Sequence, residues 1–279
     1  MNATNKNGTQ NNYLTDYLNS APISLALIRA IECKIMSALP FAHPILDLGC
    51  GDGLFSNILF KNRDYIDAAI DTSEAEVELA YKKTVYHEIK VADANDIPYA
   101  DESFKFVMAN DLFHHLQAPA AAISEAGRVL MPGGLLCFTV PTFIPAFHIR
   151  AFTSLMQSKF IQSFSPLDII KFFNHDIKTY FRLKSIFTFK NWVTTLENAG
   201  FKVIFHKKYA SFSTIVIQLI TSFYLYRGLA YKKILGRYIP FPSFHKKIIT
   251  PITSRLFESL YENDSYEGEN YLILAKKCF

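Results

Sequence analysis

The sequence predicts an α/β protein built around a mostly parallel sheet. Between residues 45 and 141, short apolar segments alternate with segments of helical periodicity, as in strands joined by crossover helices. The first apolar segment ends at Asp47, runs into a glycine-rich turn and then enters a helix near Leu54. Two later strands also end in acids, Asp71 and Asp93. Ligands of such sheets bind at the carboxyl ends of the strands, which makes these acids candidate site residues.

The glycine-rich turn spans Asp47 to Gly53 and has the form Asp-x-Gly-x-Gly-x-Gly. Glycine allows positive φ and lets the backbone approach a ligand closely, while the start of the next helix presents unpaired N–H groups. A dinucleotide fingerprint would place its third glycine at position 54, where this chain has Leu54. No Gly-Lys-Ser/Thr follows, which excludes a P-loop. The turn therefore predicts a nucleotide-like ligand of another kind.

The turn at 47–53 resembles motif I of the class I S-adenosylmethionine (SAM)-dependent methyltransferases. SAM carries an ammonium and a sulfonium and no pyrophosphate, so a carboxylate at the strand end suits it better than it suits NAD. Residues 96–104 and the later Met131–Gly134 resemble the small-molecule, or type 11, branch of this family. The resemblance is strong over residues 25–141 and loose beyond them. It implies a Rossmann-like fold with seven strands, mostly parallel, an antiparallel last strand and helices on both faces.

Each further element has its own local signal. After the first strand, apolar runs predict strands at 66–71, 86–92, 104–109, 135–140, 201–205 and 270–276. Helical spacing predicts helices at 20–39, 73–80, 120–130 and 189–199. Ser73 followed by Glu76 has the pattern of a capping box at the start of one helix. Met131–Gly134 is expected as a turn before the fifth strand.

The cofactor residues follow from the resemblance and from strand order. The predicted SAM-binding set is Asp47, Gly49, Cys50, Gly51, Gly53, Asp71, Thr72, Asp93, Ala94 and Asn110. An acid about 20 residues after the glycine turn is placed to hold ribose hydroxyls, which points to Asp71. The family implies that Asp93 and the next backbone N–H meet the adenine. All three acids could instead be ordinary caps at strand ends. Cys50 is expected to fill space in the turn rather than act as a nucleophile.

The candidate catalytic residues follow the fourth strand. Asp111, His114 and His115 come directly after it, where the transferred methyl group should point. A histidine with a near-neutral pKa could serve as a base for an oxygen or nitrogen acceptor. Alternatively, these histidines pack or contact cofactor, and alignment alone carries the reaction. The other histidines and the four cysteines show no metal-ligand spacing, so a metal-free site is predicted.

The sequence beyond 141 departs from a minimal family member. We predict a disordered tail at 1–12, a SAM-binding core at 13–209 with a substrate cap at 142–188, an aromatic-rich helical insertion at 210–268, and the last strand at 269–279. Tyr13 and Tyr17 could close over the cofactor or anchor the N-terminal segment to the core.

The insertion is basic as well as aromatic. From Asn198 to Phe257 the chain has ten lysines and arginines and no aspartate or glutamate. The uncharged stretch 210–226 is shorter than the ~20 apolar residues of a spanning helix. The insertion could be a lid or wall for a substrate pocket, a contact with an anionic membrane surface, or a contact with nucleic acid or protein. The first two are compatible.

Taken together, these patterns predict a SAM-dependent methyltransferase with a small, apolar or lipid-like acceptor. O-, N- and C-methylation stay open because they share one fold. The alternative is a catalytically inactive SAM-fold binding or scaffold protein. A nucleic-acid methyltransferase is disfavoured because the fourth strand is not followed by Asn/Asp-Pro-Pro-Tyr/Phe. The polar start of the chain is unlike a signal peptide, which predicts a cytoplasmic protein that could also lie on the inner face of the membrane.

Overall fold

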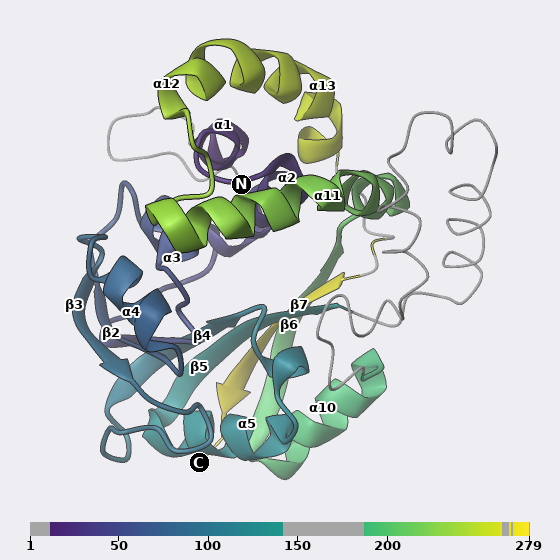
Figure 1. The fold of residues 1–279 in the computed structure, drawn as a ribbon. Coiled ribbons are helices and arrows are strands. Elements are labelled where there is room, and N and C mark those ends of the chain that lie inside the picture. The colour runs from purple at the N-terminus through teal and green to yellow at the C-terminus, as the bar shows by residue number, and fades with distance from the viewer. Residues whose placement is uncertain (1–11, 142–186, 264–267, 269, 279) are drawn as a thin grey trace.

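A computed structural model describes residues 12–141, 187–263, 268 and 270–278. Its centre is a seven-stranded sheet of order β3-β2-β1-β4-β5-β7-β6 (Figure 1). The strands are β1 (Ile45–Leu48), β2 (Ile66–Asp71), β3 (Tyr86–Val91), β4 (Phe104–Asn110), β5 (Leu130–Pro141), β6 (Phe201–Tyr209) and β7 (Asn270–Lys277). Strands β1 to β5 pair in parallel, whereas β7 is antiparallel to both β5 and β6. This confirms the predicted sheet and its antiparallel last strand.

The middle of the sheet is buried on both faces. All four residues of β1 are buried, as expected for a strand covered by helices on each side. Along β4, Phe106 and Met108 join one hydrophobic cluster, and Val107 and Ala109 join the other. Successive side chains of a strand point to opposite faces, so this alternation supplies both cores from one strand.

Helices cover both faces, as predicted (Figure 1). On one face lie α1 (Tyr13–Leu18), α2 (Ile23–Met36) and α3 (Leu54–Leu59). On the other lie α5 (Pro119–Val129) and α10 (Phe189–Asn198), around the buried Trp192. The short α4 (Glu74–Ala80) begins at Ser73, whose side chain accepts from the Glu76 amide, in agreement with the predicted start of that helix.

Two predicted boundaries were wrong. The helix expected at 20–39 is α2, which is shorter at both ends, since Pro22 is its N-cap with extended backbone and Ser37 is its C-cap. The short α1 before it was not predicted. Strand five was expected to start at Leu135 after a turn, but β5 begins at Leu130. Leu130 pairs with Phe104 and Leu135 with Phe106, so the intervening Met131–Gly134 forms an irregularity inside the strand.

Tyr13 and Tyr17 are buried in the cluster formed with α2. Their rings lie in the core, which supports the anchoring alternative and argues against closure over a cofactor. Tyr17 is 1% exposed and its neighbours include Cys33, whose side chain is also buried.

The region after β6 is helical, as predicted. It consists of α11 (Phe212–Leu235), α12 (Pro242–Phe244), the π turn η2 (His245–Ile249) and α13 (Thr250–Glu262). Figure 1 shows α11 crossing α2, and α12 and α13 on the far side of α1 from the sheet. Within the described parts of the chain, no helix combines the length and the apolar character needed to cross a membrane.

The domain boundaries stay predictions. Residues 1–11 and 142–186, which include most of the predicted tail and substrate cap, lie outside the described residues.

Candidate active site

The glycine turn leaves β1 beside β2. The amides of Gly49 and Cys50 both donate to the Ile70 carbonyl, at 2.8 and 3.0 Å, which fixes the first half of the turn. Gly53 is the N-cap of α3 with a φ of 71°, a left-handed conformation that favours glycine. A Cβ placed on Gly51 would meet no atom within 4 Å, so this side of the turn is open. The turn therefore presents an accessible backbone cradle at the carboxyl edge of the sheet.

Asp71 connects the end of β2 to that cradle. Its Oδ2 accepts from the Gly51 amide at 2.9 Å, and its Oδ1 accepts from the Ser73 amide at 2.9 Å. Each carboxylate oxygen can accept further hydrogen bonds, so these contacts leave room for a ligand hydroxyl. Thr72, which lies between Asp71 and Ser73 in the sequence, is exposed. The structure thus brings Asp71, Thr72 and Gly51 to one place, as their spacing predicts.

Asp47 lies beneath the turn rather than on its surface. It is 3% exposed, and its Oδ2 accepts from the Ser56 hydroxyl at 2.6 Å and the Tyr86 hydroxyl at 2.8 Å. Burial raises the pKa of this carboxyl to about 6, because desolvation disfavours the charged form. A cation near Asp47 would favour its ionised form.

The neighbouring Cys50 is also buried, and burial raises the pKa of its thiol above the usual range. The thiol stays protonated at neutral pH, which fits the expected space-filling role.

Asp93 lies at the end of β3, apart from the glycine turn. It is exposed, and its Oδ1 accepts from the backbone and side-chain nitrogens of Asn95 at 2.9 and 2.8 Å. The next residue, Ala94, is buried. Both residues share the carboxyl edge of the sheet with Asp71, where an extended ligand could reach all three.

A second polar cluster lies at the end of β4. Asp111 has a φ of 59°, forms an ion pair with Arg29, and places its Oδ1 3.3 Å from His114 Nε2. His114 is buried, and its Nδ1 has no hydrogen-bond partner among the described residues. Burial, then the neighbouring His115 and Arg29, lower the pKa of His114 well below its ordinary value. His114 is therefore neutral at neutral pH.

Several members of this cluster were not predicted from the sequence. Glu32, 1% exposed on α2, accepts from Arg29 at 2.7 Å, from the Asn110 side chain at 3.1 Å and from the Tyr209 hydroxyl at 2.7 Å. Thr139 on β5 donates to the Asn110 side chain at 2.8 Å. Arg29 and Glu32 lie three residues apart in a mostly apolar helix. This spacing could have indicated the cluster, because charged residues are rarely buried without partners.

A pocket opens against this cluster, between α2, the start of α11 and the ends of β4 and β5. Its polar lining includes Arg29, Glu32, Asp111, His114, His115, Gln218 and Asn270, and its apolar lining is Ile28, Pro141 and Ile215. The first turns of α11 therefore form one wall of the pocket. All three predicted catalytic residues line it.

The ligand atoms of Asp111, His114 and His115 all lie within 4.8 Å of one another, close enough to share a cation. Arg29 already neutralises the Asp111 carboxylate. The metal-free site stays a prediction.

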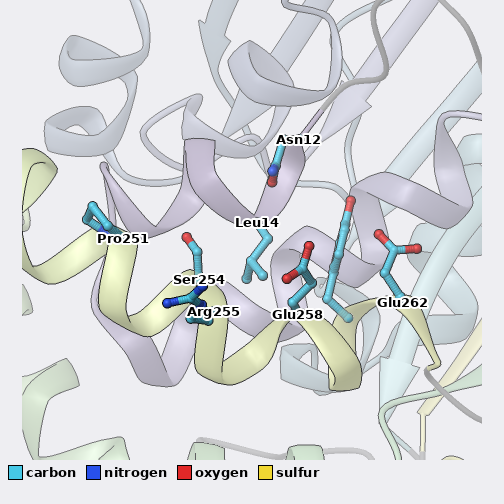
Figure 2. A pocket seen from close by; sticks show the side chains of 8 residues that line it. Asn12, Leu14, Pro251, Ser254, Arg255, Glu258 and Glu262 are labelled. Atoms are coloured by element: carbon cyan, nitrogen blue, oxygen red, sulfur yellow. The ribbon is translucent and has the colours of Figure 1, made fainter.

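A larger pocket lies between α1 and α13 (Figure 2). Its polar lining comes from Asn12, Ser254, Arg255, Glu258 and Glu262, with Leu14 and Pro251 beside them. None of the predicted site residues lines it, so it is not the candidate active site.

The end of α11 contacts the glycine turn. The ammonium of Lys232 lies 2.6 Å from Glu76 on α4 and 3.1 Å from Asp52 in the turn, and it donates to the Tyr238 hydroxyl at 3.1 Å. Burial lowers the pKa of Lys232, but its charged and polar neighbours outweigh burial and raise the pKa above its ordinary value. Lys232 therefore remains charged and connects the insertion to the cofactor side of the sheet.

The strand order reverses between β1 and β4, with the glycine turn at that switch point and acids at the ends of the neighbouring strands. Ligands of open α/β sheets bind in the crevice at such a switch point. Residues 46–138 match the family described as "Methyltransferase domain", which confirms the resemblance to the type 11 branch of SAM-dependent methyltransferases.

Two curated relatives and one solved structure illustrate the similarity. The chain is 35% identical over 135 residues to 27-O-demethylrifamycin SV methyltransferase of Amycolatopsis mediterranei, covering 46% of this chain and 49% of the relative. It is 36% identical over 103 residues to sarcosine/dimethylglycine N-methyltransferase of Halorhodospira halochloris, covering 35% and 37%. The matched region thus spans less than half the length of these curated relatives.

The crystal structure of a SAM-dependent methyltransferase from Thermotoga maritima has a TM-score of 0.51 to this chain, at 18% identity, covering 95% of this chain and 91% of that one. At this identity the likeness concerns the fold alone.

Proposed function

We propose that this chain binds SAM and transfers its methyl group to a small acceptor. The observation that carries the proposal is the hydrogen bond from the Gly51 amide to the Asp71 carboxylate. It holds the glycine turn as an open backbone cradle at the switch point of the sheet. The methyltransferase-domain match over residues 46–138 supports the same conclusion. SAM, when bound, supplies an electrophilic methyl group.

The proposed cofactor site uses the carboxyl edge of the sheet. Asp71 and Thr72 would hold ribose hydroxyls, and Asp93 with the Ala94 amide would meet the adenine. In the turn, Gly49, Cys50, Gly51 and Gly53 would allow close approach of the ligand, with Asp47 buried beneath them. Asp47 would balance cationic charge, and Asn110 would border the reacting end of the ligand.

The proposed acceptor site is the pocket at the end of β4. Ile28, Pro141 and Ile215 would contact an apolar body, and α11 would form a wall of the pocket, in line with the lid or wall alternative. His115 or Asp111 would accept a proton from an oxygen or nitrogen nucleophile. His114 is a poor base because burial holds its pKa low, so it would orient Asp111 instead.

The acceptor is proposed as a small molecule with an apolar or lipid-like body. The two curated relatives bear names of an O- and an N-methyltransferase, so their acceptors differ in the methylated atom. Shared fold does not decide between them.

Calorimetry with SAM and S-adenosylhomocysteine tests the cofactor site. We expect binding of both by the full chain, and about 10- to 100-fold weaker binding by Asp71→Ala, since hydrogen bonds to a charged group contribute about 1.5–3 kcal/mol. Asp64→Ala, an exposed acid before β2, serves as a matched control and should bind normally. No binding of either ligand by the wild-type chain would contradict the proposal.

Methyl incorporation tests the reaction itself. Tritiated methyl groups from SAM should appear in acceptors of lipid or aqueous extracts of the source cell. Tight SAM binding without incorporation into any fraction would favour the binding or scaffold alternative.

A further inference from the structure

The helical stretch formed by α12, η2 and α13 exposes a row of large apolar side chains. Phe241, Phe244, Ile248, Ile252 and Leu256 are 73%, 57%, 47%, 58% and 68% exposed. We call these five residues the apolar row. From Phe244 onward they recur every four residues, which places them along one side of the helix. The π turn at His245–Ile249 winds more residues into each turn, which keeps positions four apart better aligned than a plain α-helix would.

The opposite side of the same helix is packed against the protein. Thr250, Thr253 and Tyr261 are buried, and Phe257 and Leu260 pack against the cluster that contains α1 and α2. At its end, Lys34 on α2 forms an ion pair with Glu262 at 2.6 Å. The helix is therefore held by its inner side, and the residues of the apolar row are not among those buried there. A contiguous exposed apolar surface of this kind marks an interaction site.

All charged residues between the first and the last residue of the apolar row are basic. Lys246 and Lys247 are exposed on the same stretch, whereas Arg255 lines the pocket between α13 and α1, and no acid occurs between Asn198 and Phe257. The first acids, Glu258 and Glu262, line the pocket between α13 and α1 (Figure 2). The apolar row therefore has basic neighbours and no acidic residue within its length. Figure 1 places α12 and α13 on the outside of the molecule, where this surface can be reached.

A complementary partner must offer an apolar interior beside a layer of negative charge. An anionic lipid bilayer offers both, because a helix can lie in its interface with apolar side chains among the acyl chains and basic ones among the head groups. A nucleic acid would contact the lysines but would leave the five apolar side chains in water. We propose that the apolar row and its basic neighbours form a docking surface for anionic membranes. This proposal does not depend on methyl transfer.

Vesicle flotation with the full chain tests the docking surface. Vesicles of phosphatidylcholine mixed with phosphatidylglycerol should bind the protein at low salt, and bind it less at high salt as the charges are screened. Vesicles of phosphatidylcholine alone should bind weakly. No binding to the mixed vesicles at low salt would overturn the proposal.

Paired variants separate the two parts of the surface. I252S/L256S should weaken binding about tenfold or more by removing buried apolar area. K246Q/K247Q should weaken binding roughly 25-fold, at about fivefold per basic residue near an anionic surface. Because all four positions are exposed, melting temperatures should stay near the wild-type value.

Matched controls are available elsewhere on the surface. Ile204→Ser removes an apolar side chain that is 49% exposed on β6, and K82Q/K105Q removes two exposed lysines. Both controls should bind vesicles as the wild type does. Vesicle binding that is unchanged in I252S/L256S, or an equal loss in the controls, would contradict docking through the apolar row. Binding of RNA with the same dependence on Ile252 and Leu256 would also contradict it.

Discussion

At the scale of single residues, the buried Asp47 links the stability of the glycine turn to pH. Its pKa in the folded protein is raised from 3.8 to about 6, mainly by burial. A raised carboxyl pKa means that the folded state favours the protonated form. The resulting stability is fully present below the unfolded pKa and is lost as the pH rises through about 6.

Asp47→Asn should therefore be more stable than the wild type at pH 7. The gain should grow between about pH 4 and pH 6 and then level off, with an upper limit of roughly 3 kcal/mol for a shift of about two pKa units. Urea unfolding at pH 4.5 and pH 7 measures the difference. A variant whose relative stability falls as the pH rises would contradict the assigned protonation.

The two histidines after β4 differ in environment and should differ in effect. His115→Ala should lower kcat about 100-fold and leave the Kd for SAM unchanged, as expected for loss of a general base. His114→Ala should act mainly through stability, because the side chain is buried and held near Asp111. Steady-state kinetics together with SAM titrations separate the two effects. If both variants keep full turnover, alignment of the acceptor alone carries the reaction.

At the scale of elements, α11 holds two parts of the molecule together. Its first turns line the acceptor pocket through Ile215, and its last turn reaches the glycine turn through Lys232. The element that limits the acceptor pocket is thus also joined to the proposed cofactor site.

Lys232→Met should disturb both stability and cofactor binding. Loss of the ammonium leaves Asp52 and Glu76 without their shared cation, at a cost of about 1–3 kcal/mol in unfolding free energy. The KM for SAM should rise several-fold because Asp52 belongs to the glycine turn. Thermal melts and SAM titrations check these effects, with Lys233→Met, an exposed neighbour, as the control. Equal effects from both variants would mean that the ion pairs are unimportant.

At the scale of the whole molecule, the sheet joins two hydrophobic clusters. Trp192, the single tryptophan of the chain, is fully buried in the cluster with Phe113 and Phe138. Its fluorescence therefore reports the face of the sheet covered by α5 and α10, whereas the glycine turn is joined to the other face by α3.

Saturating SAM should stabilise the fold as seen by Trp192. At a hundred times its Kd, a ligand that binds only the folded state adds about 2.7 kcal/mol, which should move the urea midpoint upward. Trp192 emission and far-ultraviolet circular dichroism should agree with each other on the midpoint, both in the absence of SAM and at the higher midpoint in its presence. A shift seen by circular dichroism alone would mean that the two faces unfold independently.

The sheet and the glycine turn could be predicted because their signals are local. Apolar runs, glycine positions and strand-end acids recur within short stretches, and parallel strands end at one edge of the sheet. The polar cluster at β4 was predicted only in part. Asp111 and the histidines follow a strand, but Glu32 meets Asn110 across 78 residues of sequence and Tyr209 across 177.

By itself, the sequence determined the fold class, the antiparallel last strand and the edge where the proposed cofactor site lies. The fold class and the edge depend on periodicity and on backbone conformations that only glycine adopts readily, whereas the antiparallel last strand was implied by the family resemblance. Tertiary structure decided which charges are buried together, that His114 stays neutral, and that α11 reaches both the acceptor pocket and the glycine turn. It also decided which side of α13 remains exposed. Those properties depend on desolvation and on contacts between distant segments, which no local pattern encodes.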